Sequence, residues 1–114
     1  MPNTLHYLNM LIRRWNERIV DDERTNALLR GQTRTVQVTT EDGPFHFSFD
    51  GKAISSAVAG VMPNADIKVS GPSLLLKDVA VGRKSLLPAI VTKRIKVDAG
   101  MRDIILMKRL AGML

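Results

Sequence analysis

Residues 101–114 read MRDIILMKRLAGML, and this closing stretch decides how the fold is interpreted. Nine of its residues are apolar and only four are charged. At about 100° per residue, its apolar side chains form two stripes along a helix. The first stripe contains Ile104, Met107, Ala111 and Leu114, and the second contains Leu106, Leu110 and Met113. The protein's own core can cover one stripe, and the second then needs an apolar ligand, a partner chain or a membrane surface, unless the fold buries both.

The composition limits the classes of protein to which the chain can belong. A length of 114 residues favours a single domain, residues 1–114, with its own hydrophobic core. Cysteine is absent, which excludes disulfides, thiolate metal sites and a cysteine nucleophile. The sequence has no secretory leader pattern and no apolar run of about 20 residues, so we expect a cytoplasmic protein. A net charge of +6 and a pI near 10.2 favour acidic partners such as lipid headgroups, phosphates or nucleic acid.

The first third of the chain predicts two helices. An amphipathic helix, capped by Asn3 or Thr4, is indicated by apolar residues at alternating steps of three and four. These residues are Leu5, Leu8, Ile12, Trp15 and Ile19. Trp15 fits either the core or a ligand contact. A short second helix is expected to begin at the acidic residues 21–22 and to stop at Gly31.

The remainder predicts strands with interspersed helices. Twofold alternation predicts strands over residues 33–40, 45–50, 52–58, 65–70 and 94–98, and the first three are expected to form an antiparallel meander. Phe45, Phe47 and Phe49 then share one face of the sheet. Helices are expected over residues 74–81 and 86–91, the second capped by Ser85. The predicted fold is therefore α+β, a mostly antiparallel five-stranded sheet with helices packed on one face.

Several groups of polar residues resemble reactive sites and have simpler explanations. His46, Ser48 and Asp50 are the residue types of a nucleophilic triad, but neighbours on one strand face lie about 6.6 Å apart and a triad normally gathers separate segments. The acidic run at residues 21–23 fits the start of a helix better than a metal site. Residues 82–85, GRKS, lack the order of a phosphate-binding loop. The cationic residues are scattered without interleaved aromatics, which does not indicate specific nucleic-acid binding.

The apolar residues leave two arrangements open. The inward faces of the predicted strands and helices either close into a solid core or line a cavity with the last helix as its lid. Ile95 and Leu74 are among the residues expected to face inward. Ligand pockets are lined by the same apolar residue types as cores, so composition does not separate the two.

The order of segments resembles the sterol-carrier lipid-transfer family. The resemblance is carried by the leading helix, QTRTVQV at residues 32–38, the turn at residues 42–43, FSFDG at 47–51 and ADIKVS at 65–70. It continues through GRK at residues 82–84, RIKV at 94–97 and the closing apolar helix.

The resemblance implies a hydrophobic tunnel between sheet and helices that holds a sterol, fatty acyl or isoprenoid lipid without transforming it. The implied ligand-binding residues are Trp15, Phe45, Phe47, Phe49, Ile67, Leu75, Leu87, Ile90, Leu106, Leu110 and Met113. Catalytic residues, metals and cofactors are not expected. The absence of a peroxisomal Ser-Lys-Leu ending agrees with a cytoplasmic location.

Two partner hypotheses follow from the same residues. The basic residues would bring a carrier into peripheral contact with acidic membranes. Alternatively, Leu106, Leu110 and Met113 would dock against a second copy in a homodimer, or against another protein. The run at residues 93–97 is similar to that of bacterial accessory factors in ubiquinone biosynthesis, which makes a lipid-handling accessory module the alternative function.

Overall fold

The computed structural model describes residues 3–113, apart from the side chains of Thr25 and Leu28. The expected position of Leu114 on the first apolar stripe therefore lies outside the described residues. Helices and strands follow in the order α1 (Thr4–Asp21), α2 (Glu23–Leu29), β1 (Arg34–Thr40), β2 (Gly43–Phe49), β3 (Val58–Ala59), β4 (Ile67–Ser70), α3 (Ser73–Ala80), α4 (Leu86–Val91), β5 (Lys96–Asp98) and α5 (Met101–Gly112).

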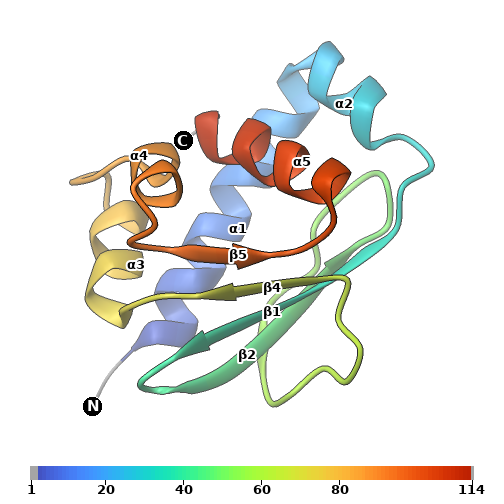
Figure 1. The fold of residues 1–114 in the computed structure, drawn as a ribbon. Helices are drawn as coiled ribbons and strands as arrows, with labels where there is room; N and C mark the ends of the chain where they lie inside the picture. Colours follow the sequence, from blue (N-terminus) through green and yellow to red (C-terminus); the bar gives the residue numbers. More distant parts are fainter. Residues whose placement is uncertain (1–2, 114) are drawn as a thin grey trace.

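The sheet is mixed, with strand order β3-β2-β1-β4-β5. Three of its pairings are antiparallel, and β1 and β4 pair in parallel with Val36 opposite Ile67. The α+β fold and its mostly antiparallel sheet are therefore confirmed, with one parallel pairing at the centre. Figure 1 shows α1 passing diagonally across the strands, with α3 and α4 at one end of the sheet and α5 alongside β5.

The face of the sheet that meets the helices is apolar. Alternate residues of β1, β2 and β4 are buried, including Val36, Phe47 and Ile67, while the residues between them are exposed or half-buried. The expected common face of the three phenylalanines is therefore confirmed. Leu8, Leu11, Ile12, Trp15 and Ile19 supply the opposing side from α1. The core lies between this helix and the sheet, closed at its margins by α3, α4 and α5.

The third expected strand is much shorter than predicted. Strand β3 covers two residues, and a single bridge joins Phe49 to Ile54 earlier in the segment. The backbone of this segment bonds instead to two asparagine side chains of α1. The Ile54 N–H donates to Asn16 Oδ1 at 2.7 Å, and the Ile54 carbonyl oxygen accepts from Asn16 Nδ2 at 2.9 Å. Ala57 makes the same pair of bonds to Asn9, so its polar groups are satisfied without a sheet partner.

One side chain and one strand boundary in the later segments differ from expectation. Leu74 is 66% exposed on α3, so its expected place among the inward-facing residues is wrong. Its neighbours Leu75 and Leu76 are buried instead, because α3 packs against α1 through the other side of the helix. Ile95 is buried as expected, but it precedes β5 rather than lying within it. Among the described residues, no helix is long and apolar enough to cross a membrane.

Candidate functional site

Helix α5 covers one margin of the core with a single broad apolar face. Leu106, Met107, Leu110 and Ala111 are buried, so both predicted stripes contribute to the same buried surface. Leu106 is 7% exposed and Leu110 is 3% exposed. The protein's own fold thus covers the second stripe, and these two leucines are not a surface for a partner chain. The docking hypothesis through them is wrong in this arrangement, because the stripes lie side by side on the helix rather than on opposite sides.

A polar bond fixes α5 to α1 from inside the core. The indole Nε1 of Trp15 donates a hydrogen bond to the carbonyl oxygen of Leu110, at 2.8 Å. Because a buried indole N–H needs an acceptor, this bond sets the position of the Trp15 ring under the last helix. Trp15 is therefore part of the core, and its ring lies where α1, α5 and the sheet meet.

A small apolar void lies beside the Trp15 ring. Its volume is about 30 Å³, and the residues around it come from α1, β1, β2, β4, α3, α4, the segment before β5 and α5. The lining residues are Leu8, Leu11, Trp15, Val36, Val38, Phe47, Val69, Leu76, Leu86, Ile90, Ile95 and Met107. All of these side chains are buried. A site for a drug-sized ligand spans about 300–1,000 Å³, so this void is too small for one and the core is well filled.

The residues expected to line a tunnel occupy three positions. Trp15, Phe47 and Ile90 line the void. Phe49, Ile67, Leu75, Leu106 and Leu110 are buried in the surrounding core, and Phe45 is buried but also borders a surface cleft near the start of α1. Leu87 and Met113 are half-buried against the core.

Several lining residues are not in the set implied by the resemblance. Leu11 precedes Ile12 on α1 and lies one turn before Trp15, so a broader apolar stripe would have included it. Val36 and Val38 share the inward face of β1 and were identifiable from twofold alternation. Leu76 and Leu86 lie within uniformly apolar runs, where periodicity does not show which side chain points inward.

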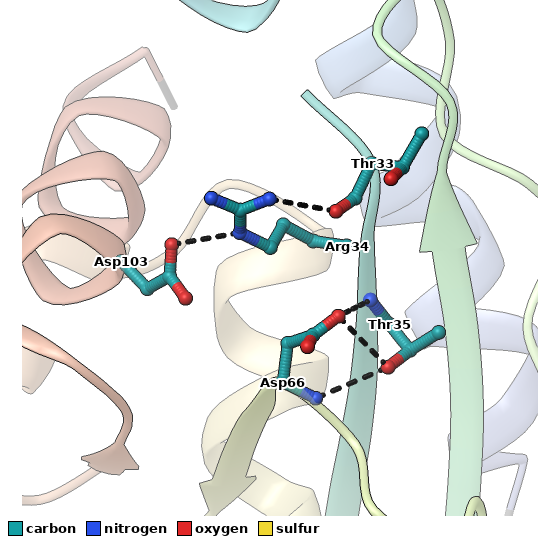
Figure 2. A network of polar contacts seen from close by, with 5 residues as sticks. All are labelled: Thr33, Arg34, Thr35, Asp66 and Asp103. Carbon is teal, nitrogen blue, oxygen red and sulfur yellow. Dashed lines mark hydrogen bonds and ion pairs between the residues drawn. The ribbon is translucent and has the colours of Figure 1, made fainter. Parts of the chain in front are cut away.

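The outer margin of the site is a cleft between α5 and the start of β1. It has a volume of about 220 Å³ and is lined by Gln32, Arg34, Arg102, Asp103, Ile105 and Leu106. Figure 2 shows Arg34 reaching from β1 to Asp103 on α5, with Nε 2.9 Å from Oδ1. The same guanidinium donates to the Thr33 carbonyl at 2.7 Å. Leu106 connects this cleft to the core, because it lines the cleft and is itself a buried core residue.

The three residues that resemble a catalytic triad each bond to a different partner and not to one another. His46 Nδ1 lies 3.0 Å from the Gly60 carbonyl oxygen, and Ser48 Oγ lies 3.5 Å from Ser55 Oγ. The Asp50 carboxylate accepts from the backbone N–H groups of Lys52 and Ala53. These bonds lower the pKa of Asp50, with the Ala53 N–H as the largest cause. The carboxylate therefore organises a turn.

The other polar groups also have local structural roles. Arg83 and Lys84 lie 4.0 Å and 3.9 Å from the Asp78 carboxylate. The Glu41 carboxylate accepts hydrogen bonds from the hydroxyl and the N–H of Ser73 at the start of α3, and the hydroxyl is the first cause of its lowered pKa. Among the described residues, no cluster of histidine and acidic side chains could hold a metal ion.

The comparisons place this geometry among known proteins. A model of the SCP-2 sterol transfer family matches residues 8–114, whereas a search of curated proteins found no match. The ubiquinone synthesis protein UbiJ-SCP2 has a similar structure, with a TM-score of 0.62 and 14% identity over 98% of this chain and 96% of that one. Sterol carrier protein 2 of Aedes aegypti, solved with palmitate, gives a TM-score of 0.56 and 12% identity over 100% of this chain and 99% of that chain.

A larger enzyme contains a region of the same fold. The sec-alkylsulfatase Pisa1 from Pseudomonas sp. is 20% identical, with a TM-score of 0.56 over 78% of this chain. The match covers only 14% of the alkylsulfatase, so it concerns one part of that protein. At these identities the solved structures show a shared fold, and the family model supplies the assignment. Because that model spans almost the whole chain, the protein belongs to the SCP-2 sterol transfer family.

Proposed function

We propose that this protein binds and transfers an elongated hydrophobic molecule, a sterol, fatty acyl or isoprenoid lipid, between its sheet and helices without changing it chemically. Family membership and the bound palmitate of the mosquito relative support this function. We also propose that residues 1–114 act as one ligand-binding domain, in the cytoplasm and in peripheral contact with acidic membranes.

The apolar void is the observation that carries this proposal. Every residue around it is apolar apart from the indole N–H of Trp15, and that group already donates to Leu110. An extended lipid at this place would meet only hydrocarbon and aromatic surfaces, which is the environment that favours its transfer from water.

Binding requires the core to expand, since a void of about 30 Å³ does not accommodate a lipid. Helix α5 is the proposed moving element. Two described side-chain bonds hold it to the rest of the fold: Trp15 to the Leu110 carbonyl, and Arg34 to Asp103. Outward movement of α5 would enlarge the void at Met107 and open it toward the cleft beside Leu106. In this proposal, Leu106, Leu110 and Met113 close over the ligand.

The filled core favours a second candidate function. A core without ligand-sized space fits an accessory module that acts through its surface, of the kind suggested by the likeness to the ubiquinone synthesis protein. A homodimer belongs to this second candidate. Because Leu106 and Leu110 are buried, such a module would need another surface for its partner.

Fluorescence of Trp15 separates the two functions, since the chain contains one tryptophan and its ring lines the void. A carrier should show saturable quenching by a dibromo-stearic acid at one molecule per chain. Bromoacetate, which carries the quencher without the long chain, is the matched control and should leave the fluorescence unchanged. Native mass spectrometry should then show one lipid per chain. Lack of quenching, together with a lipid-free discrete oligomer, would favour the accessory module.

A further inference from the structure

The outward side of α5 carries two large apolar residues that the core does not use. Met101 is 76% exposed and Ile105 is 59% exposed. They lie four residues apart, so their side chains neighbour each other on the same side of the helix. Neither belongs to the buried surface formed by Leu106, Met107, Leu110 and Ala111.

Three cations share that side of the helix with them. Arg102, Lys108 and Arg109 are exposed, and so is Gly112 in the last turn. At about 100° per residue, these cations together with Met101 and Ile105 occupy an arc of about 120°. We refer to Met101, Arg102, Ile105, Lys108 and Arg109 as the outer face of α5.

The positive charge of the outer face is not neutralised by acidic side chains nearby. In the part of the chain that the structure describes, its three cations form no ion pair. Asp103 is the acidic residue of α5, and it is half-buried on a different side of the helix, where it bonds to Arg34. Neighbouring β5 has an exposed Lys96 and an exposed Asp98, whose charges cancel. Any partner of this face should therefore be anionic.

We propose that the outer face of α5 docks onto an anionic membrane surface. Its cations suit lipid phosphates, and Met101 and Ile105 can enter the boundary between headgroups and acyl chains. The cleft beside β1 includes only Arg102 and Ile105 of this face. A cationic helix surface that also carries apolar side chains is typical of helices that lie on an anionic membrane. Met107, on the opposite side of the same helix, lines the void, so a docked α5 would face lipid while it controls access to the core. This inference rests on the proposed carrier function.

Vesicle co-sedimentation tests the docking with a charge-matched control. The vesicles contain phosphatidylcholine alone or mixed with phosphatidylglycerol. The test variant is Lys108→Glu/Arg109→Glu, and the control is Arg13→Glu/Arg18→Glu, two exposed residues of α1. Both double variants change the net charge by the same four units. Thermal unfolding and circular dichroism verify that each remains folded.

The unmodified protein should bind the phosphatidylglycerol vesicles and lose binding at high salt. The α5 variant should bind roughly thirty-fold more weakly or worse, because each cation near an acidic surface contributes on the order of 1 kcal/mol. The α1 control should keep most of its binding. Equal loss in both variants, or no binding by the unmodified protein, would overturn the proposal.

Quenching of Trp15 by the dibromo-stearic acid in the same variants keeps the two proposals apart. Retained quenching without vesicle binding would overturn docking and leave the carrier function standing. Vesicle binding through α5 without quenching would overturn the carrier function and leave the proposed membrane docking standing.

Discussion

Arg34 of β1 and Asp103 of α5 form an ion pair across 69 positions of sequence, with Nε and Oδ1 2.9 Å apart. Their side chains are 27% and 16% exposed, so solvent screens the pair less than a fully exposed one. The pair joins the first turn of the last helix to the strand at the centre of the sheet. Figure 2 shows this link beside the bonds between Thr35 and Asp66, which connect β1 to the segment before β4.

Replacement of Asp103 by asparagine should loosen α5 without disrupting the core. The variant keeps the shape of the side chain but loses its charge, and we expect a stability loss of about 1 kcal/mol or less. Amide hydrogen exchange in α5 should accelerate more than exchange in β1, and a bound fatty acid should dissociate faster. Asp98→Asn is the matched control, because it removes the same charge from an exposed position outside α5. Unchanged exchange in α5 would show that the ion pair does not restrain the helix.

Replacement of Met107 by alanine should enlarge the void that this residue lines. The ligand-free protein should lose about 2–5 kcal/mol of unfolding free energy, the usual cost of truncating a large core side chain. If the void is the ligand site, saturating fatty acid should restore more stability to this variant than to the unmodified protein. Ile105→Ala on the exposed side of α5 should change stability by less than about 1 kcal/mol. Urea unfolding with and without the fatty acid measures both effects.

Replacement of Asn16 by alanine should release the segment that follows β2. The change leaves the backbone N–H and carbonyl of Ile54 without their side-chain partner. Unsatisfied buried groups cost about 1–3 kcal/mol each, and partial access to water reduces this, so we expect a loss of about 1–3 kcal/mol. Glu17→Ala, at an exposed position of the same helix, is the control. Protection of the Ile54 amide against hydrogen exchange should fall in the asparagine variant alone.

Replacement of Ser73 by alanine should raise the pKa of Glu41 toward its ordinary value of 4.5, because the Ser73 hydroxyl is the largest cause of the lowered pKa. A lowered pKa in the folded state contributes stability above pH 4.5, and that contribution disappears as the pH falls through the folded-state value. The stability difference between the two proteins should therefore shrink in acid. An NMR titration of the Glu41 carboxyl carbon checks the pKa, with Ser70→Ala as the control. An unshifted titration would refute the role of the hydroxyl.

The sequence predicts the elements whose periodicity is strong. Phe45, Phe47 and Phe49 share a buried face because strand residues alternate, and the α1 stripe is buried because its spacing is helical. The third strand is shortened because its segment bonds to asparagine side chains 38 and 48 positions away, which a local pattern does not reveal. Periodicity also does not specify strand partners, so the parallel pairing of β1 and β4 was not predictable.

The candidate site was only partly predictable. Residue type identified the apolar interior, but a filled core and a lipid cavity use the same residue types, so the sequence does not show which of the two forms. The exposure of Met101 and Ile105 was also missed. The two predicted stripes form one continuous buried side of α5. The remaining, exposed side of the helix therefore carries Met101 and Ile105, which belong to neither stripe.

The hydrogen bond from Trp15 to Leu110 has a consequence for biosynthesis. The two residues are separated by 95 positions, so a ribosome releases the indole long before its acceptor exists. Until then, the indole N–H can donate only to water or to another temporary acceptor, and the large apolar ring lacks the cover that α5 provides in the folded protein. We therefore expect protease resistance to appear only after residues 101–112 have emerged from the ribosome.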